Sequence, residues 1–203
     1  KVLKDTNIMI ASDEIYSELT YSGKHCSIAE IEGMRERTIV INGFSKSFAM
    51  TGWRLGFLGG PKEIVSQMLK LHQYAIMSSP TVSQYAAIVA MHSCQKDIDA
   101  MRNEYNIRRR FVVDSFNKLG LKCFAPQGAF YVFPCIKSTG MTSTDFCEKL
   151  VYTKKVAVVP GDAFGECGEG YVRVSYAYSL NHLREAIKRI GEFLEDIKNG
   201  NVQ

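Results

Sequence analysis

Short apolar runs separated by polar, glycine-rich segments characterise the first half of the chain. Residues 8–11, 38–41 and 55–58 are such runs, and their length and polar flanks predict buried strands of a parallel sheet. Pro61 follows the third run at a position that favours the first residue of a helix. The helix itself is predicted by apolar residues at spacings of four, three and four, namely Ile64, Met68, Leu71 and Ala75.

The second half has a different pattern, in which a long polar helix leads to short strands and helices. The predicted helices cover residues 84–94, 96–119 and 144–151. The predicted strands cover residues 130–133, 156–159 and 171–176. A closing amphipathic helix is marked by Leu183, Ile187, Ile190, Leu194 and Ile197.

These elements predict two domains joined by a helix. We expect a partial large α/β domain over residues 1–95, a connecting helix over residues 96–119 and a small α+β domain over residues 120–203. The chain starts at Lys1 with residues typical of the middle of a helix, and with neither a signal peptide nor an initiator methionine. We therefore expect it to be a piece of a longer protein.

The composition is that of a folded protein. Of the 203 residues, 46% are hydrophobic and 23% are charged, which supports a sizeable core and excludes a disordered chain. No apolar run approaches the ~20 residues that span a bilayer, so no membrane is expected as a partner. The net charge of +4 is spread along the chain, with no basic stripe beyond Arg108 to Arg110, so nucleic acid is not expected as a partner either.

Cysteine and histidine residues are scattered along the sequence. The six cysteines include no Cys-x-x-Cys pair and the four histidines do not cluster, so no metal site is expected. Reduced, buried thiols in a cytoplasmic protein explain this usage, because disulfides are rare in reducing compartments. The cysteines are Cys26, Cys94, Cys123, Cys135, Cys147 and Cys167.

Candidate chemistry is concentrated between Asn42 and Gly56, where a strand leads into a loop with one lysine. A lysine near the end of a sheet is partly desolvated, and burial lowers the pKa of an amine toward nucleophilic competence. Lys46 can therefore form a Schiff base with a carbonyl compound. Arg54 has the planar guanidinium that binds a phosphate through two hydrogen bonds, and Ser45 adds a hydroxyl. Taken alone, a lysine and an arginine at this spacing are more often ordinary loop charges.

The segment from Ser45 to Gly56, SKSFAMTGWRLG, resembles the lysine motif of class I aminotransferases dependent on pyridoxal 5'-phosphate (PLP). It is most similar to the branch that includes aspartate and aromatic aminotransferases. The resemblance implies that Lys46 carries PLP as a Schiff base and that Arg54 binds its phosphate. Many relatives have a serine three residues before the lysine, where this chain has Gly43, and Ser45 is then the hydroxyl that serves the phosphate.

The segment from Ser12 to Tyr16, SDEIY, resembles the motif of the same family that binds the pyridine ring. Asp13 follows the first predicted strand, where ligands approach an open α/β sheet, and its charge can hold the ring nitrogen protonated. At ~4 Å and an effective dielectric constant of ~20, such a pair is worth about 4 kcal/mol before desolvation. Tyr16 can donate a hydrogen bond to the phenolic oxygen of the ring. Without the resemblance, Asp13 is more simply explained as a helix cap.

A third segment, from Gly170 to Tyr176 (GYVRVSY), resembles the family segment whose arginine binds the α-carboxylate of the substrate. An arginine in a half-buried strand requires an anion. From the residues alone, that anion is equally well a side chain of the protein, such as Glu166 or Glu169. The resemblance assigns Arg173 to the substrate carboxylate.

The resemblance covers essentially the whole chain but only the C-terminal half of the family's sequence. Residues 126–131 and 159–164 also match family segments, and their aromatic side chains are expected in the substrate pocket or in the core. The implied fold is fold type I of PLP-dependent transferases, with an open, mostly parallel sheet flanked by helices and an α+β small domain. The absent half supplies the glycine-rich loop for the phosphate and the aromatic residue that stacks on the ring.

The implied activity is that of an aspartate aminotransferase-like enzyme, which moves an amino group between an amino acid and a 2-oxo acid through a Schiff base at Lys46. Family members are homodimers, so a homodimer is implied for the whole protein. One alternative is a PLP-dependent C–S β-lyase of the same fold. The other is a non-catalytic truncated module, in which the first domain exposes sheet edges and apolar faces.

Overall fold

The structure is a computed structural model, and it describes residues 2–3 and 5–201. The chain forms two compact units, residues 1–102 and 103–203, and helix α4 (Gln95–Lys118) contains the boundary between them in the sequence. The strands and helices of the first unit before α4 are β1 (Ile10–Asp13), β2 (Thr38–Gly43), α1 (Phe44–Ser47), β3 (Gly56–Gly59), α2 (Lys62–Ala75) and α3 (Thr81–Ser93). Its loops contain the short 3₁₀ helices η1 (Ile28–Glu30), η2 (Arg35–Arg37) and η3 (Thr51–Trp53).

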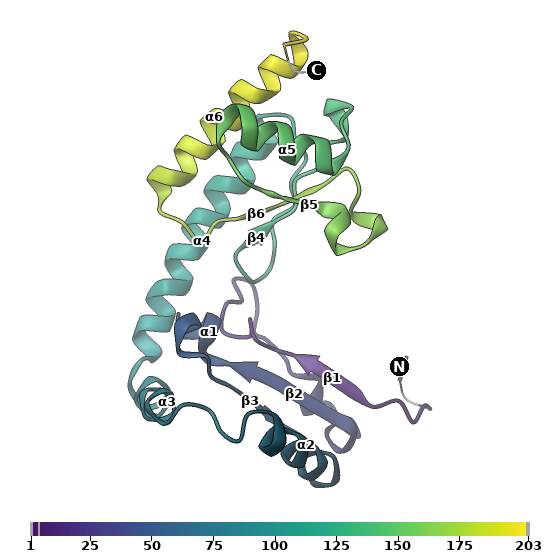
Figure 1. Ribbon diagram of the computed structural model, residues 1–203, viewed down its shortest axis with the longest axis vertical. Helices are drawn as coiled ribbons and strands as arrows, with labels where there is room; N and C mark the ends of the chain where they lie inside the picture. The colour runs from purple at the N-terminus through teal and green to yellow at the C-terminus, as the bar shows by residue number, and fades with distance from the viewer. Residues whose placement is uncertain (1, 4, 202–203) are drawn as a thin grey trace. The chain divides into compact units, whose positions relative to one another are not determined.

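The sheet of the first unit has the strand order β1-β2-β3 and contains both kinds of pairing. β1 and β2 are parallel, with Asp13 opposite Ile41. β2 and β3 are antiparallel, because only α1 and η3 connect them and a parallel pair needs a long crossover. Figure 1 shows β1 and β2 directed toward the same edge, with α1 directly beyond the end of β2. All three predicted runs form strands, although β1 begins at Ile10 rather than at residue 8. The prediction of a buried, parallel strand is wrong for the third run, because the short connection makes β3 antiparallel and its four residues are exposed.

Two glycines face each other where β2 ends and β3 begins. Gly43 pairs with Gly56, and a Cβ atom added to Gly43 would lie 3.1 Å from the Gly56 Cα and 3.2 Å from the Leu55 carbonyl oxygen. A Cβ added to Gly56 would lie 3.1 Å from the Asn42 carbonyl oxygen. Backbone atoms cannot move aside as a flexible side chain can. The close approach of the two strands therefore favours glycine at both positions, because a Cβ atom would push the backbones apart by a few tenths of an ångström.

Helices α2 and α3 carry large apolar side chains that the described part of the chain leaves exposed. The predicted helix around residues 64–75 is confirmed as α2, but none of its residues is buried. Leu71 of its apolar stripe is 73% exposed, and the neighbouring Tyr74 is 94% exposed. On α3 the exposed apolar residues are Val82, Tyr85, Ile88, Val89 and Met91. The expectation of exposed apolar faces in the first unit is confirmed.

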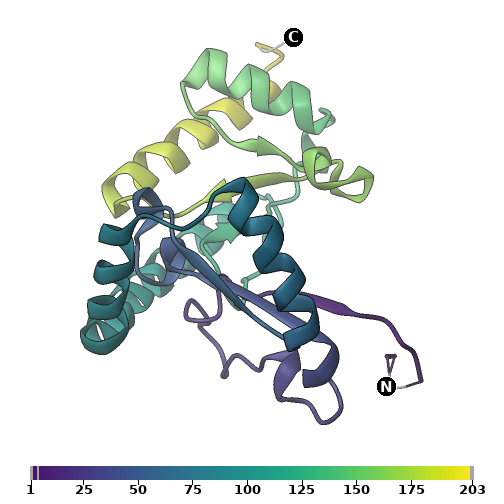
Figure 2. The same ribbon diagram turned by 60° about the horizontal axis from the view of Figure 1, so that its bottom comes forward.

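The second unit combines a small antiparallel sheet with two packed helices. β4 (Tyr131–Val132), β6 (Val172–Ser175) and β5 (Val159–Pro160) are neighbours in that order. α5 (Ser143–Lys154) and α6 (Leu180–Lys198) lie side by side (Figure 2). They pack against each other, with 5.2 Å between the ring centroids of Phe146 and Phe193. The 3₁₀ helices η4 (Lys137–Thr139), η5 (Gly161–Phe164) and η6 (Glu166–Gly168) lie in the connections.

The predicted elements of the second unit are found, and each of its three strands is shorter than predicted. Hydroxyl caps begin both helices, since Thr142 accepts a hydrogen bond from the Asp145 amide and Ser179 accepts one from the His182 amide. Of the strand predicted over residues 156–159, only the last residue pairs in the sheet. In the described part of the chain, no helix is long and apolar enough to cross a membrane.

All six cysteines are unpaired thiols, but they differ in exposure. Cys123 and Cys147 are buried as predicted, and burial raises the pKa of each thiol to about 11. The negative charge of Asp162 adds to the rise in pKa at Cys147. The prediction of a buried thiol is wrong for Cys26 and Cys167, which are exposed, the first in an irregular segment and the second in the short 3₁₀ helix η6.

We expect Cys26 and Cys167 to react with a thiol reagent in the folded protein, whereas Cys123 and Cys147 react only after unfolding. The thiolate is the reactive form, and a pKa of about 11 instead of 9.0 lowers its fraction at a given pH about a hundredfold. Mass spectrometry of peptides labelled with and without urea measures the difference. Equal labelling of all four residues without urea would contradict the prediction.

Candidate functional site

Five residues singled out in the sequence lie at one edge of the first unit's sheet. Asp13 is the last residue of β1, and the parallel register places it opposite Ile41, near the end of β2. Lys46 follows β2 directly in α1, with Ser45 beside it in the sequence. Arg54 lies just before β3, whose first residue pairs with the last residue of β2. Tyr16 lies in the turn that leaves β1. The strand pairings therefore bring the three segments to the same edge, as Figure 1 shows.

The segment that carries Lys46 rests on a small apolar cluster. Phe44 and Met50, before and after the lysine, are buried and pack with two alanines of α3. The hydroxyl of Ser83, also on α3, donates a 2.7 Å hydrogen bond to the Trp53 carbonyl oxygen. Lys46 itself is half-buried. These contacts fix the backbone on both sides of the lysine, so its amine extends from a rigid support.

The loop between Lys46 and β3 contains two non-glycine residues with left-handed backbone. Ala49 and Arg54 both have φ of 53°. The left-handed conformation costs roughly 1–2 kcal/mol for a residue with a Cβ atom, and such residues concentrate at functional sites. The Thr51 hydroxyl donates to the Ser45 carbonyl oxygen at 3.0 Å, and the Arg54 guanidinium donates to the Thr51 carbonyl oxygen at 2.9 Å. Thr51 thus links the serine and the arginine that the sequence assigns to one anion.

Hydrogen bonds also fix the turn that follows β1. The Ile15 amide donates to Asp13 Oδ1 at 3.1 Å, which orients the exposed Asp13 carboxylate. Asn42 connects this turn to β2, because its Nδ2 donates to Ser17 Oγ at 3.2 Å. The same side chain accepts a 2.7 Å hydrogen bond from the Gly43 amide through its Oδ1. One amide side chain therefore links the turn after β1 to the residue that precedes α1.

Glu14, in the middle of that turn, is a buried acid. Glu14 is 7% exposed. Its carboxylate accepts hydrogen bonds from Ser27 Oγ at 2.6 Å, His25 Nε2 at 2.9 Å and Ser12 Oγ at 3.1 Å. Burial raises the pKa of this carboxyl, but the three hydrogen bonds and the attraction of His25 outweigh that effect, so its pKa lies below the ordinary value of 4.5. Because an ionised carboxylate only accepts hydrogen bonds, His25 Nε2 is the donor.

Sequence reasoning missed the cluster around Glu14. His25 and Ser27 follow it 11 and 13 residues later, beyond an irregular segment in which sequence spacing does not predict contacts. The sequence offered one weak signal. Ser12, Asp13 and Glu14 are consecutive polar residues after an apolar run, and because side chains alternate along a strand, at least one of them has to point toward the protein.

Arg173 belongs to β6 of the second unit and is held by aromatic rings. Its guanidinium carbon lies 4.6 Å from the ring centroid of Tyr131 and 4.5 Å from that of Phe164. The alternative of a salt bridge is wrong, since no ion pair of the described residues involves Arg173. Glu169 accepts instead from the Ser143 amide at 2.9 Å, at the start of α5. Tyr131 and Phe164 come from the two aromatic segments that the sequence placed in a substrate pocket or the core.

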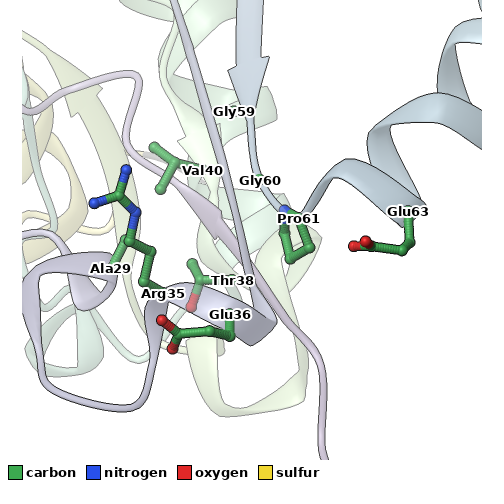
Figure 3. A pocket seen from close by; sticks show the side chains of 9 residues that line it. All are labelled: Ala29, Arg35, Glu36, Thr38, Val40, Gly59, Gly60, Pro61 and Glu63. Carbon is green, nitrogen blue, oxygen red and sulfur yellow. The ribbon is translucent and has the colours of Figure 1, made fainter.

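A separate hollow of about 500 Å³ lies at the opposite edge of the first sheet (Figure 3). It is lined where β2 begins and β3 ends, by residues that include Arg35, Thr38, Gly60 and Glu63. Its charges have both signs, and the Thr38 hydroxyl already donates to the Met34 carbonyl oxygen at 2.6 Å. None of the residues assigned from the sequence lines this hollow.

Comparison with known proteins gives consistent matches. Aminotransferase class I and II is the family that matches residues 1–190. An aspartate aminotransferase of Pyrococcus abyssi is 48% identical over 195 residues, which are 95% of this chain and 50% of that protein. Aromatic-amino-acid aminotransferase 2 of Thermococcus litoralis is 47% identical, with the same coverage of both chains. The chain therefore spans about half the length of the curated relatives it matches.

Solved structures agree with the fold. The crystal structure of an aromatic aminotransferase from Pyrococcus horikoshii matches with a TM-score of 0.94 at 45% identity, over 97% of this chain and 54% of that chain. The fold inferred from the motifs, the C-terminal part of a PLP-dependent transferase of fold type I, is confirmed.

We expect Glu14→Gln to lower the free energy of unfolding at neutral pH by about 1–3 kcal/mol, because a buried charged acceptor is lost. The pKa of Glu14 is lower in the folded state than the ordinary 4.5, so its stabilisation is fully present above about pH 4.5 and is lost as the pH falls through the folded-state pKa. The gap between wild type and variant should therefore shrink in acid. Urea unfolding followed by circular dichroism at several pH values measures the gap.

The control for this experiment is Glu32→Gln, which alters an exposed acid of the same unit. Its stability should follow that of the wild type at every pH. A Glu14→Gln deficit that stays constant down to about pH 3 would contradict the linkage.

Proposed function

This chain belongs to the class I and II aminotransferase family, and on that premise we propose that the protein is an amino acid aminotransferase similar to aspartate aminotransferases. Its reaction moves an amino group between an amino acid and a 2-oxo acid. The observation that carries the proposal is the convergence of Asp13, Lys46 and Arg54 on one sheet edge, at positions that match the family's motifs. Aspartate and aromatic amino acids are both candidate substrates, because relatives of similar identity are named for each.

Members of this family depend on pyridoxal 5'-phosphate, and the groups at this edge fit its chemistry. Lys46 offers an amine for the aldehyde, and Asp13 offers a carboxylate for the basic ring nitrogen. Tyr16 offers a hydroxyl for the phenolic oxygen of the ring. Arg54 offers a guanidinium and Ser45 a hydroxyl for the phosphate. These five residues form the part of the cofactor site that this chain provides.

Each residue has a distinct task in the proposed reaction. When bound, the cofactor supplies a carbonyl carbon for the amino group and a ring that withdraws electrons from the amino acid. Lys46 Nζ is the base that would take the proton from the substrate Cα and deliver it to the cofactor carbon that holds the amino group. Asp13 holds the proton on the ring nitrogen. Arg54 neutralises the phosphate charge and keeps the cofactor from rotating.

Arg173 is the proposed site for the α-carboxylate of the substrate. Tyr131 and Phe164 lie within about 5 Å of its guanidinium carbon, so the rings hold the cation without neutralising its charge. The N–H groups of a guanidinium form two parallel hydrogen bonds with a carboxylate, which fixes both the position and the orientation of the amino acid.

We further propose that the whole protein is a homodimer in the cytoplasm. The exposed apolar side chains of α2 and α3 support an assembled state in which this surface is covered. The six unpaired cysteines support a reducing compartment. Light scattering of the full-length protein tests the first point, and a monomer mass would contradict it.

Replacement of Lys46 tests the proposed activity. In the full-length protein, Lys46→Ala should abolish the visible absorption band of lysine-bound cofactor and lower kcat for amino transfer at least about a thousandfold. Absorption spectra and coupled assays with aspartate and aromatic amino acids measure both effects. Lys62→Ala, which removes an exposed lysine at the start of α2, should leave both unchanged.

The same assays distinguish the alternatives. Release of pyruvate from cystathionine without a 2-oxo acid would identify a C–S β-lyase. Absence of PLP binding by the full-length protein would identify a non-catalytic module. An unchanged spectrum in Lys46→Ala would refute the assignment of the lysine.

We expect Arg173→Lys to raise KM for the amino acid roughly tenfold to a hundredfold with little change in the Kd for PLP, because lysine neither stacks between rings nor forms two parallel hydrogen bonds. Steady-state kinetics and fluorescence titration separate the two constants. Arg184→Lys is a matched control, since Arg184 also lies over a ring, 5.9 Å from the centroid of Phe111, but is exposed on α6. An equal rise in KM for both variants would contradict the assignment.

A further inference from the structure

A buried cluster stands behind the turn to which we assign the pyridine ring. Its centre is the Glu14 carboxylate, and its donors are the side chains of Ser12, His25 and Ser27. The adjacent Asp13 is exposed. The two neighbouring carboxylates therefore lie on opposite sides of the end of β1, as consecutive strand residues do. One faces a prospective ligand and the other faces the protein.

The cluster fixes the turn through its main chain as well. The Glu14 amide donates to the Ile41 carbonyl oxygen at 2.8 Å and continues the pairing with β2. Its carbonyl oxygen accepts from the Ser17 amide at 2.9 Å and closes the turn around Tyr16. The amide, the carbonyl oxygen and the carboxylate of Glu14 are therefore all hydrogen-bonded. Any shift of this residue therefore displaces its neighbours on both sides.

The loop that supplies the donors has its own support. The Ser27 hydroxyl accepts from the Ala29 amide at 3.3 Å while donating to Glu14 at 2.6 Å. Glu30 completes a capping box at η1 by accepting from the Ser27 amide at 3.3 Å. The segment that carries Ser27 is therefore held by its own hydrogen bonds, independently of its contact with Glu14.

Stability alone does not explain a charged cluster at this place. Burying a carboxylate costs desolvation energy, and well-packed apolar residues of similar volume often stabilise a fold as much or more. The cluster also fixes the orientation of Glu14, because hydrogen bonds have a defined geometry. Asp13, before Glu14, and Tyr16, two residues after it, are the residues assigned to the ring, and both need a fixed orientation.

We propose that Glu14, His25 and Ser27 are positioning residues that hold Asp13 and Tyr16 in register with the pyridine ring; this rests on the proposed function. The Ile15 amide already donates to Asp13 Oδ1, so the Asp13 carboxylate is held in one orientation with acceptor capacity left for the ring nitrogen. A rotation of the Glu14 backbone turns that carboxylate away. The cluster touches neither cofactor nor substrate and acts through its neighbours.

The test uses the full-length protein and PLP as the probe. Glu14→Gln should raise the Kd for PLP about tenfold, as expected when one charged hydrogen bond is weakened, and should move the pH midpoint of the visible absorption band upward. The midpoint rises because a poorly held ring proton withdraws less charge from the Lys46 nitrogen. Arg54→Lys should raise Kd without moving the midpoint. Glu32→Gln should change neither.

Conservative replacement separates positioning from bulk stability. His25→Gln keeps an N–H donor and should retain a Kd and midpoint close to those of the wild type, whereas His25→Ala should behave like Glu14→Gln. If Glu14→Gln does not fold, Ser27→Ala removes a single hydroxyl and should raise Kd several-fold. Variants with a lower Tm but unchanged Kd and midpoint would overturn the proposal. Failure of the wild-type protein to bind PLP would instead overturn the proposed function.

Discussion

The close approach of Gly43 and Gly56 is the constraint on which the site depends. Because their backbones come so near that a Cβ atom at either position would lie about 3.1 Å from main-chain atoms, β2 and β3 join tightly at one end. The loop between them must therefore leave and re-enter at nearly the same point. Lys46 lies just after the exit and Arg54 just before the return. An amine and a guanidinium are thus brought to one edge by backbone packing.

The structure treats its charged groups in three different ways. Asp13 is left exposed with one oxygen engaged, Glu14 is buried with three donors, and Arg173 is enclosed by aromatic rings with no anion among the described residues. Of these three groups, Glu14 is the one that several hydrogen-bond donors of the described residues surround. The two groups with unsatisfied capacity are those that the motifs assign to ligands, which agrees with the cost of leaving such capacity unused in a folded protein.

Much of this organisation was predictable from the sequence, for reasons that differ between elements. The strands and helices followed from apolar runs and periodicity, since burial on one face leaves a regular trace, and the motif around Lys46 was recognisable letter by letter. The shortened β5 was not predictable, because Val156 to Val158 are as apolar as a paired strand. The cluster around Glu14 was missed because its partners come from an irregular loop, where spacing carries no information. For Arg173, the residues alone did not distinguish an ion pair within the protein from the binding of a ligand, because the aromatic rings beside it come from distant segments of the chain.

Ala49 and Arg54 share the same left-handed backbone in the same loop, yet replacing them with glycine has different consequences. Glycine adopts this conformation without strain, so selection for heat resistance alone favours glycine at both positions. At position 49 the exchange removes only an exposed methyl group. At position 54 it removes the guanidinium proposed to hold the phosphate. Fold stability and phosphate binding therefore conflict at position 54, whereas at position 49 stability can change alone. A thermostable variant of this loop is best sought at position 49.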